Sequence, residues 1–205
     1  MPPRKDARNK LLDSAMTVFR TNGYAASSVD DLCQAAGVTK GAFFHHFRSK
    51  EELAVAAAGH FGEMAEGLFS AAPFRALPDP RARVLAYIDF RGSILGDDLA
   101  DFTCLLGTLV QETYASHPAI RAACEREIVG HATTLEPDIA AALAAAGRDP
   151  GAARGLAIYI QTVLQGAFIL AKATGGPDTA AESLGHLRTH LAFLFDTDSK
   201  REILQ

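Results

Sequence analysis

The sequence predicts an all-α protein in which a small three-helix N-terminal helix-turn-helix domain is followed by a larger helical domain, with about nine helices along the chain. Apolar residues recur at intervals of three and four through most of the 205 residues, and no segment alternates as a strand would. The breaks between these periodic segments coincide with glycine and proline, which end helices. Apolar residues make up 48% of the chain and charged residues 21%, as in soluble globular proteins, so the chain is expected to fold.

The first fifty residues are expected to form three short helices. The first ends at Asn22-Gly23, because these residue types readily adopt the left-handed conformation that stops a helix. The second begins after the potential cap Ser28 and stops at Gly37, and the third follows the potential cap Thr39. The apolar face of the first helix consists of Leu11, Leu12, Ala15, Val18 and Phe19.

A capping box at Ser49 to Glu52 opens the fourth helix, which is expected to run to about Ser70. Further helices are predicted at residues 79–95, 99–115, 117–146, 151–173 and 178–195. The apolar run from Gly155 to Ala171 is interrupted by polar residues and is shorter than the ~20 residues that a membrane span needs. We therefore expect a buried or interface helix there, and no membrane association.

Charge is distributed unevenly along the chain, whose net charge is -4. Residues 1–50 hold eight Lys or Arg and four Asp or Glu, whereas residues 51–205 hold twelve and twenty. A basic segment joined to an acidic remainder is typical of a phosphate-binding module carried by a body that does not bind DNA.

Neither the N-terminus nor the cysteines indicate secretion. The basic segment MPPRKDARNK leads into an amphipathic stretch rather than the apolar core of a signal peptide. Cys33, Cys104 and Cys124 have neither the even count nor the close spacing of a disulfide framework or a zinc site. We expect a cytoplasmic protein with no metal and no cofactor.

Residues 28–47 have the pattern of a DNA-reading helix-turn-helix. Phe43 and Phe47 lie four residues apart and are expected to face inward, which leaves the opposite face of the third helix for a major groove. Helix starts supply backbone N–H groups that bind phosphates and set the register of docking. The predicted DNA-binding residues are Ser28, Thr39, Lys40, Gly41, Ala42, Phe44, His45 and Lys50.

Two other interpretations of this segment remain open. It could be a short helical corner without a DNA role, since the same geometry also occurs in enzymes and scaffolds. The adjacent His45 and His46 could suggest a metal site, but neighbours on a helix point about 100° apart. Agreement among the motif, the basic charge and the tight turn favours DNA binding.

The segment GYAASSVDDLCQAAGVTKGAFFHHFRSKEEL resembles the DNA-binding signature of the TetR/AcrR family of bacterial regulators. The resemblance covers about residues 8–54, with AAGVTKG at the turn and FRSKEEL after it. The family's usual pattern has a tyrosine where this chain has Phe44, which cannot donate a hydroxyl to a phosphate. The stretch Cys104–Glu112, followed by Pro118–Arg121, is similar to a segment found in one subset of these regulators.

The resemblance implies a C-terminal helical domain that pairs two subunits through its last two helices and encloses a variable ligand pocket. We accordingly divide the chain into a helix-turn-helix DNA-binding domain, residues 1–48, and a ligand-binding and dimerisation domain, residues 49–205. The aromatic residues of the second domain suit an apolar or aromatic ligand. The predicted pocket residues are Phe61, Tyr87, Phe90, Cys104, Thr108, Gln111, Tyr114, Tyr159, Thr162 and Gln165.

Two helices near the C-terminus are apolar on more than one face and need a second burial partner, which predicts a homodimer. Small residues are frequent on the first of these helices, and leucines form a stripe on the second. The predicted interface residues are Leu156, Tyr159, Val163, Gly166, Ala167, Leu184, Leu187, Leu191 and Leu194.

These observations predict a sequence-specific DNA-binding transcriptional regulator: a homodimeric repressor released from a pseudo-palindromic, double-stranded operator by a small-molecule effector. One alternative is an enzyme that acts through Cys104 or Glu112, although no catalytic spacing supports it. Another is a ligand carrier whose DNA-binding role has lapsed, with Phe44 as its best support. Cys104 could be a reactive thiol or part of the core, and Gln111-Glu112 could line the pocket or form an exposed helix face.

Overall fold

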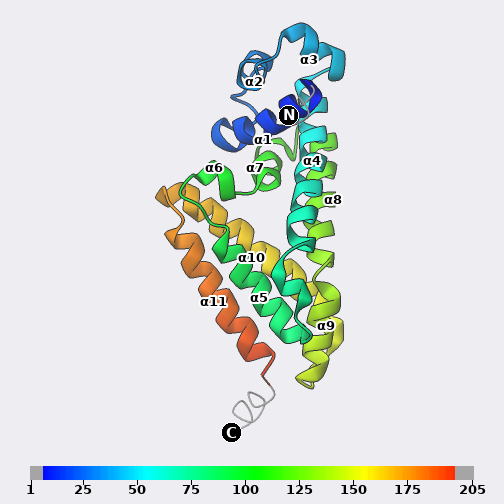
Figure 1. Cartoon of the computed structure of the whole chain (residues 1–205), viewed down its shortest axis with the longest axis vertical. Coiled ribbons are helices and arrows are strands. Elements are labelled where there is room, and N and C mark those ends of the chain that lie inside the picture. Colours follow the sequence, from blue (N-terminus) through cyan, green and yellow to red (C-terminus); the bar gives the residue numbers. More distant parts are fainter. Residues whose placement is uncertain (1–6, 197–205) are drawn as a thin grey trace, which may run out of the picture. The chain divides into compact units, whose positions relative to one another are not determined.

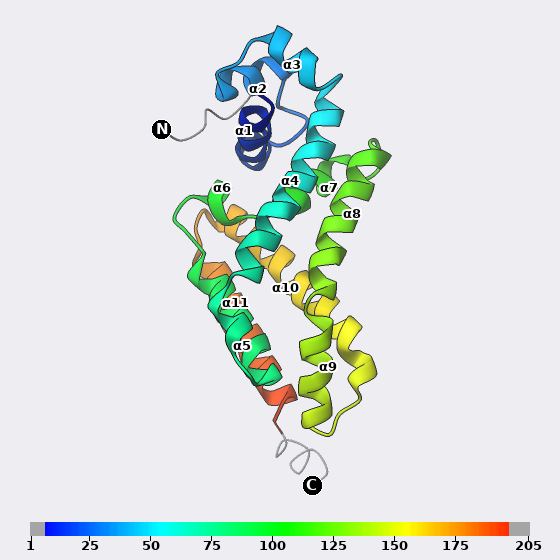
Figure 2. The same ribbon diagram turned by 45° about the vertical axis from the view of Figure 1, so that its right-hand side comes forward.

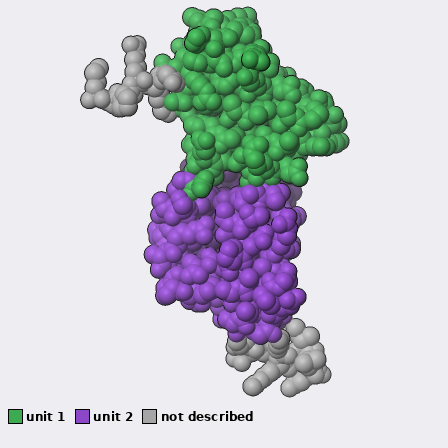
Figure 3. Space-filling model, turned by 90° about the vertical axis from the view of Figure 1, so that its right-hand side faces the viewer, with its two compact units in different colours: residues 1–66, 103–128 green, residues 67–102, 129–205 purple. Residues whose placement is uncertain are grey.

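The computed structural model describes residues 7–196, which form eleven α-helices and two short 3-10 helices with no β-strand in that range (Figure 1). The expected all-α class is confirmed. The described residues divide into two compact units, coloured separately in Figure 3. Unit 1 combines the chain up to Glu66 with Thr103–Ile128, and unit 2 combines Gly67–Phe102 with the chain from Val129.

The compact units do not follow the expected boundary at residues 48 and 49, because residues up to Glu66 and residues 103–128 also pack in unit 1. Two helices, α4 (Lys50–Ser70) and α8 (Pro118–Thr133), begin in unit 1 and end in unit 2. The division between DNA-binding and ligand-binding functions remains a prediction, since a compact unit is defined by packing alone.

Unit 1 is built around α1 (Ala7–Asn22), which packs against α2 (Val29–Ala36), α3 (Lys40–His46) and α7 (Leu105–Thr113). The buried face of α1 has the expected helical spacing and continues into a core shared with α4, α7 and α8. The buried residues of α1 are Leu11, Leu12, Ala15, Met16 and Phe19.

The ends of the first helices follow the expected signals. Gly23 and Gly37 have φ values of 84° and 61°, in the left-handed region that stops α1 and α2. The Ser28 hydroxyl accepts the N–H of Asp31 at 3.1 Å and caps α2. The Ser49 hydroxyl likewise accepts the N–H of Glu52 at 3.1 Å.

Unit 2 contains the end of α4, η1 (Pro73–Ala76), α5 (Pro80–Ser93), α6 (Leu99–Phe102), the end of α8, α9 (Glu136–Ala145), η2 (Pro150–Ala152), α10 (Ala153–Thr174) and α11 (Asp178–Leu194). Its two longest helices, α10 and α11, pack side by side (Figures 1 and 2). Helix α5 packs against both α9 and α11, and α9 also packs against α10.

Two of the expected helices are each interrupted. The segment 99–115 forms α6 and α7, separated at Thr103 and Cys104, where Cys104 has an extended backbone (φ -78°, ψ 119°). Apolar residues occur on both sides of the break because both helices have a buried face. Leu99 of α6 packs in the core of unit 2, whereas Leu105 of α7 packs in the core of unit 1. The segment 117–146 divides into α8 and α9, where Pro137 occupies the first turn of α9.

Residues Pro150–Thr174 form the one candidate membrane span within the described residues, by length and composition alone. Its most apolar 18-residue window has a mean hydropathy of 1.4, and 39% of that window is buried. The segment is longer than the expected apolar run because the helical residues extend beyond both ends of that run, from Pro150 to Thr174. One face of α10 is buried in unit 2, and its opposite face exposes apolar side chains.

Candidate nucleic-acid interface

Helix α3 is anchored by aromatic side chains on one face. Phe43 is 0% exposed and Phe47 is 3% exposed, and both belong to the core of unit 1. The hydroxyl of Thr39 accepts the N–H of Ala42 at 3.1 Å and fixes the start of the helix. This short helix therefore has a defined orientation within unit 1, because packing and capping act together.

The residues on the other side of α3 are open to solvent. Lys40, Gly41, Phe44 and His45 are exposed, and the Phe44 ring is 57% exposed, which is unusual for a large apolar side chain. Ala42 is half-buried. The two caps Ser28 and Thr39 are also exposed. The surface of α3 is thus small, basic and hydrogen-bonding around one exposed aromatic ring.

Lys40 forms an ion pair across the turn. Its Nζ lies 2.7 Å from Oδ1 of Asp30, and both side chains are mostly exposed. The hydrogen bond to Asp30, followed by the charge of that carboxylate, raises the pKa of Lys40. A DNA phosphate or base edge that binds Lys40 must therefore replace Asp30 as the partner of this ammonium group.

Lys50 lies partly inside unit 1, which was not expected for a phosphate contact. Its Nζ donates to the carbonyl oxygens of Tyr24 and Ser27, each at 2.8 Å, and lies 4.2 Å from the centre of the Tyr24 ring. Burial lowers the pKa of Lys50, and the carboxylate of Glu112 opposes that effect. Two of the three N–H groups of Lys50 are therefore engaged by the loop between α1 and α2.

Glu112 on α7 binds the same loop through backbone N–H groups. Its Oε1 accepts the N–H of Tyr24 at 3.2 Å, and its Oε2 accepts the N–H of Ala25 at 2.9 Å. Gly23 precedes these residues, and a Cβ atom at Gly23 would collide with the Glu112 carboxylate. We refer to Lys50, Glu112 and the loop residues Gly23–Ser27 that they hold as the loop clamp.

No pattern in the sequence indicates this role for Glu112. The sequence left open a pocket residue or an exposed helix face, and Glu112 is indeed exposed. The two hydrogen bonds join residues 87 and 88 positions apart along the chain, so no local spacing reveals them. The glycine at position 23 was interpreted only as a helix stop.

The part of the chain that the structure describes contains no group of three His, Cys, Asp or Glu side chains that could hold a metal ion. The rings of His45 and His46 contact each other with centres 4.8 Å apart. The three cysteines are free thiols. Burial raises the pKa of Cys124 to about 12 and also raises that of Cys33, while Cys104 is half-buried against the unit 1 core.

The residues predicted to line a ligand pocket divide between the two units. Phe61, Cys104, Thr108, Gln111 and Tyr114 lie in unit 1, and Tyr87, Phe90, Tyr159, Thr162 and Gln165 lie in unit 2. Phe61 and Cys104 are half-buried, whereas Gln111 and Tyr114 are exposed, Tyr114 by 62%. Thr108 and Gln111 donate to carbonyl oxygens one turn back in their own helix.

Within unit 2, two of the predicted pocket residues share an aromatic cluster. Tyr87 and Phe90 of α5 both contact the rings of Phe69 and Phe74. Tyr159 and Thr162 of α10 are exposed instead, and Gln165 is half-buried. Phe74 and the neighbouring His131 have no signal in the sequence, since an isolated ring or histidine on a helix belongs to no local pattern.

Four of the predicted dimer-interface residues are buried within unit 2 itself. Ala167, Leu184, Leu187 and Leu191 are each at most 4% exposed, because α10 and α11 pack on one another and α11 packs on α5. The other five are half-buried or exposed: Leu156, Tyr159, Val163, Gly166 and Leu194. The same two helices expose further apolar side chains, namely Ile158, Ile169, Leu170 and Phe193.

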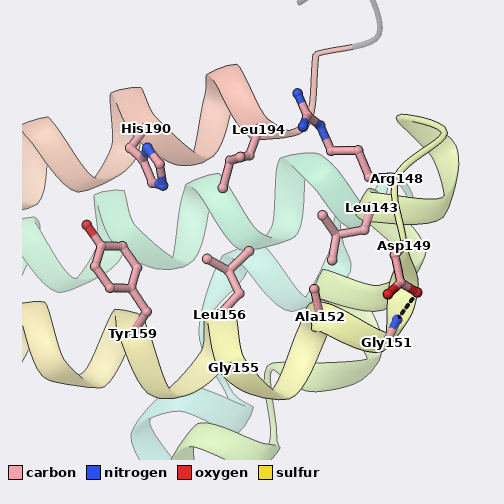
Figure 4. Close-up of a pocket in the computed structure, with 10 residues that line it drawn as sticks. All are labelled: Leu143, Arg148, Asp149, Gly151, Ala152, Gly155, Leu156, Tyr159, His190 and Leu194. Atoms are coloured by element: carbon pink, nitrogen blue, oxygen red, sulfur yellow. Dashed lines mark hydrogen bonds between the residues drawn. The ribbon is translucent and has the colours of Figure 1, made fainter. Parts of the chain in front are cut away.

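An open groove of about 650 Å³ runs between α10 and α11. Tyr159 and Leu156 of α10 point toward His190 and Leu194 of α11 across it (Figure 4). The ring centres of Tyr159 and His190 are 5.7 Å apart. The remaining lining residues are Leu143, Arg148, Asp149, Gly151, Ala152 and Gly155.

Two family models match the chain. The one described as bacterial regulatory proteins, tetR family, matches residues 11–57, which include α2, α3 and the start of α4. The one described as the C-terminal domain of LmrA/YxaF-like transcriptional regulators matches residues 80–179, from the start of α5 to the start of α11. The two matches cover the helix-turn-helix and most of the remaining helices.

Curated proteins and solved structures agree with these matches. The chain is 28% identical over 125 residues to the uncharacterized HTH-type transcriptional regulator YxaF of Bacillus subtilis (strain 168), covering 60% of this chain and 65% of that protein. It is 41% identical over 58 residues to the HTH-type transcriptional repressor KstR2 of Rhodococcus jostii (strain RHA1), covering 25% and 28%. Both matches span less than two thirds of the relative's length. A TetR transcriptional regulator from Chloroflexus aurantiacus J-10-FL superposes with a TM-score of 0.75 at 25% identity, covering 91% of this chain and 92% of that one.

Proposed function

This chain belongs to the TetR family of bacterial transcriptional regulators, and we propose that it is a cytoplasmic, homodimeric repressor that leaves its operator when a small molecule binds. The surface of α3 is the observation that carries the DNA-binding part of the proposal. Phe43 fixes the inner face, so Lys40, Phe44 and His45 form an outer face that a major groove can accept. Lys40 and His45 can donate to base edges or phosphates, and the Phe44 ring can contact a thymine methyl group.

The loop clamp supports a positioning role for Lys50 beside the proposed DNA contacts. Its ammonium holds the carbonyl oxygens of Tyr24 and Ser27, and Ser27 immediately precedes the α2 cap Ser28. Lys50 would then act on DNA chiefly by orienting the start of α2. Its third N–H remains the group that could reach a phosphate.

We place the dimer interface on the exposed face of α10 and α11. Ile158, Ile169 and Leu170 on α10 continue the exposed apolar surface that begins at Tyr159, and Phe193 extends it on α11. Neighbouring exposed apolar side chains on a helix are stabilised when a partner covers them. Ala167, Leu184, Leu187 and Leu191 would support the interface from the core rather than touch the partner.

The proposed mechanism is a shift between two dimer conformations. In one, the two α3 helices lie about 34 Å apart and enter successive major grooves, and effector binding favours the other. A hundredfold loss of operator affinity needs a coupling free energy of about 2.7 kcal/mol, within the usual range for allosteric proteins. Helix α4 is the proposed lever, because it carries Lys50 of the loop clamp near its start and Phe69 of the aromatic cluster near its end.

A duplex titration tests the DNA-binding proposal. The full-length protein is titrated against its own promoter region and against a scrambled duplex at two salt concentrations. We expect tight, salt-sensitive binding to the promoter alone, and loss of that binding in Lys40→Glu. The control is Arg126→Glu, which makes the same charge change at an exposed, ion-paired residue of α8 in unit 1. Equal weak binding to both duplexes would refute the proposal and favour a ligand carrier.

The release mechanism has a separate test, because allosteric coupling is reciprocal. An effector that lowers operator affinity must itself bind less tightly to the operator complex than to the free dimer. Equal effector affinity for the two forms would exclude the two-state mechanism while leaving the operator result intact.

A further inference from the structure

A buried polar group lies inside the aromatic cluster of unit 2. The Tyr87 side chain is 0% exposed, and its hydroxyl lies 3.0 Å from Nε2 of His131 on α8. The Phe69 ring contacts both of these side chains, with ring centres 5.5 Å from Tyr87 and 4.7 Å from His131. Phe74 packs edge-on against Tyr87. The tyrosine and histidine are therefore enclosed by phenylalanine rings rather than by water.

Gln161 on α10 adds a buried amide whose two N–H donors are not both satisfied, since the neighbouring Tyr87 hydroxyl can accept from only one of them. Its side chain is only 6% exposed, and its buried Nε2 has no partner at hydrogen-bonding distance and angle. The amide lies beside the Tyr87 hydroxyl and, as a hydrogen-bond donor to it, lowers the pKa of the phenol, although its geometry falls outside that of a full hydrogen bond. A buried amide N–H without an acceptor is destabilising, so such groups are rare unless a ligand or water completes them.

Arg91 on α5 contributes a guanidinium without a carboxylate partner among the described residues. The group lies over the rings of Phe69 and Phe168, at 5.0 and 5.7 Å from their centres, and its side chain is half-buried. The carboxylate of Asp138 is occupied by Arg83 at 2.7 Å and is 3.9 Å from Arg75. We call Tyr87, Arg91, His131 and Gln161 the buried polar cluster.

The electrostatics of this cluster are positive. Burial, followed by the charges of Arg91 and Arg75, lowers the pKa of His131 to about 4, so the imidazole is neutral near pH 7. Burial also raises the pKa of Tyr87, and Arg91 opposes that rise. The arginine charge therefore reaches both members of the hydrogen-bonded pair without being neutralised there.

We infer that the buried polar cluster is the effector subsite for the carboxylate of an aromatic acid. A carboxylate only accepts hydrogen bonds, so it matches the guanidinium of Arg91 and the unsatisfied amide of Gln161. The phenylalanine rings suit the flat, apolar body of such a molecule. Phe90 and Arg91 are half-buried, whereas Phe69, Phe74 and Tyr87 are buried, which places the entry side at the first two residues. This inference rests on the proposed function for its physiological role, and on unit 2 alone for its chemistry.

Direct binding of a fluorescent acid tests the inference without DNA. The probe is 2-naphthoate, and its neutral counterpart is 2-naphthamide. The chain has no tryptophan, so naphthyl emission can be followed on the full-length protein without that background. We expect saturable binding of 2-naphthoate with at least a tenfold preference over 2-naphthamide. Equal affinities for the two probes, or no saturable binding of 2-naphthoate, would overturn the inference.

Three variants locate the site. Arg91→Gln is expected to weaken 2-naphthoate binding about tenfold and to leave the amide unchanged, because it removes a charge-assisted contact. Gln161→Glu supplies a carboxylate from the chain itself, so it should exclude 2-naphthoate even if Arg91→Gln does not fold. The control Arg188→Gln changes an exposed arginine of α11 that pairs with Asp89 in the same unit. Unchanged 2-naphthoate affinity in Gln161→Glu, with helical content retained, would refute the assignment.

The result is separable from the proposed function. Operator binding is measured in the absence of any probe, and unit 1 carries the proposed DNA contacts. A wild-type protein that binds its operator but shows no saturable 2-naphthoate binding would refute only the inferred subsite. Binding of 2-naphthoate by a protein that binds no operator would refute only the regulator.

Discussion

Glu112 accepts hydrogen bonds from two consecutive backbone N–H groups, of Tyr24 and Ala25, that a loop side chain would otherwise have to satisfy. The carboxylate can approach the loop because Gly23 has no Cβ atom. Its distance along the chain from the helix-turn-helix explains why residue-level patterns did not reveal it. A single exposed carboxylate thus connects α7 to the loop that precedes α2.

Two glycine substitutions separate the backbone effect from this contact. Gly23 and Gly37 both have left-handed φ, so alanine at either site should cost about 1–2 kcal/mol of unfolding free energy. Only at Gly23 would the new Cβ also collide with Glu112, whereas the space at Gly37 is open. We expect Gly23→Ala to be the more destabilising in urea unfolding, and the excess to vanish in a Glu112→Ala background. An excess that persists there would show that Glu112 is not its cause.

Phe44 offers a second test at the scale of one residue. Its ring is 57% exposed, so Phe44→Tyr should leave the free energy of unfolding unchanged within about 0.5 kcal/mol. If the helix docks in a major groove, the added hydroxyl supplies a phosphate contact and should tighten operator binding several-fold. A promoter titration of both proteins measures this change. Unaltered operator affinity would show that position 44 does not approach the backbone of DNA.

At the scale of elements, the helices with strong end signals could be predicted from the sequence. α2 and α3 have a capping serine or threonine and a glycine between them, and α11 follows a glycine-proline break. The divisions of 99–115 and 117–146 were missed for different reasons. Pro137 was an available signal that was not used, whereas the break at Thr103 lies where adjacent apolar residues belong to different cores.

The exposed face of α10 predicts how the subunits associate. Ile169 is 47% exposed, and we expect Ile169→Glu to raise the dimer dissociation constant by at least tenfold, because it buries a charge against the partner's apolar surface. Sedimentation equilibrium measures the change, and operator affinity should fall with it. Met64→Glu is the control, since Met64 is 52% exposed on α4 outside the proposed interface. Unchanged association in Ile169→Glu would move the interface elsewhere.

At the scale of the whole molecule, the candidate DNA surface was easier to predict than the effector or dimer residues. The DNA surface comes from one contiguous segment, in which local spacing decides which face of α3 is buried. Gln161 and His131 both reach Tyr87 through the packing of unit 2, and Leu187 and Leu191 are buried in its core. Residues that become neighbours only in the folded chain leave no periodic signal in the sequence.

The buried imidazole of His131 also links the stability of the whole molecule to pH. Its pKa is about 4 in the folded protein and about 6.5 in the unfolded chain, so only the unfolded chain gains a proton between these values. Its contribution is fully present above pH 6.5 and is lost as the pH falls toward 4, with a slope of at most about 1.4 kcal/mol per pH unit. Urea unfolding at several pH values should show a shallower dependence in His131→Gln. The exposed control His186→Gln should keep the wild-type slope, and equal slopes for all three proteins would contradict the assignment.

The loop clamp determines which helices of this protein can be exchanged in a chimera. Glu112 and Lys50 bind N–H and carbonyl groups of the main chain, which are the same for almost every amino acid. The loop clamp therefore does not depend on the side chains at positions 25 and 26, and it requires a glycine only at position 23. A chimera that keeps Gly23–Ser27, Lys50 and Glu112 and receives α2 and α3 from another regulator would keep the loop clamp while acquiring a new operator.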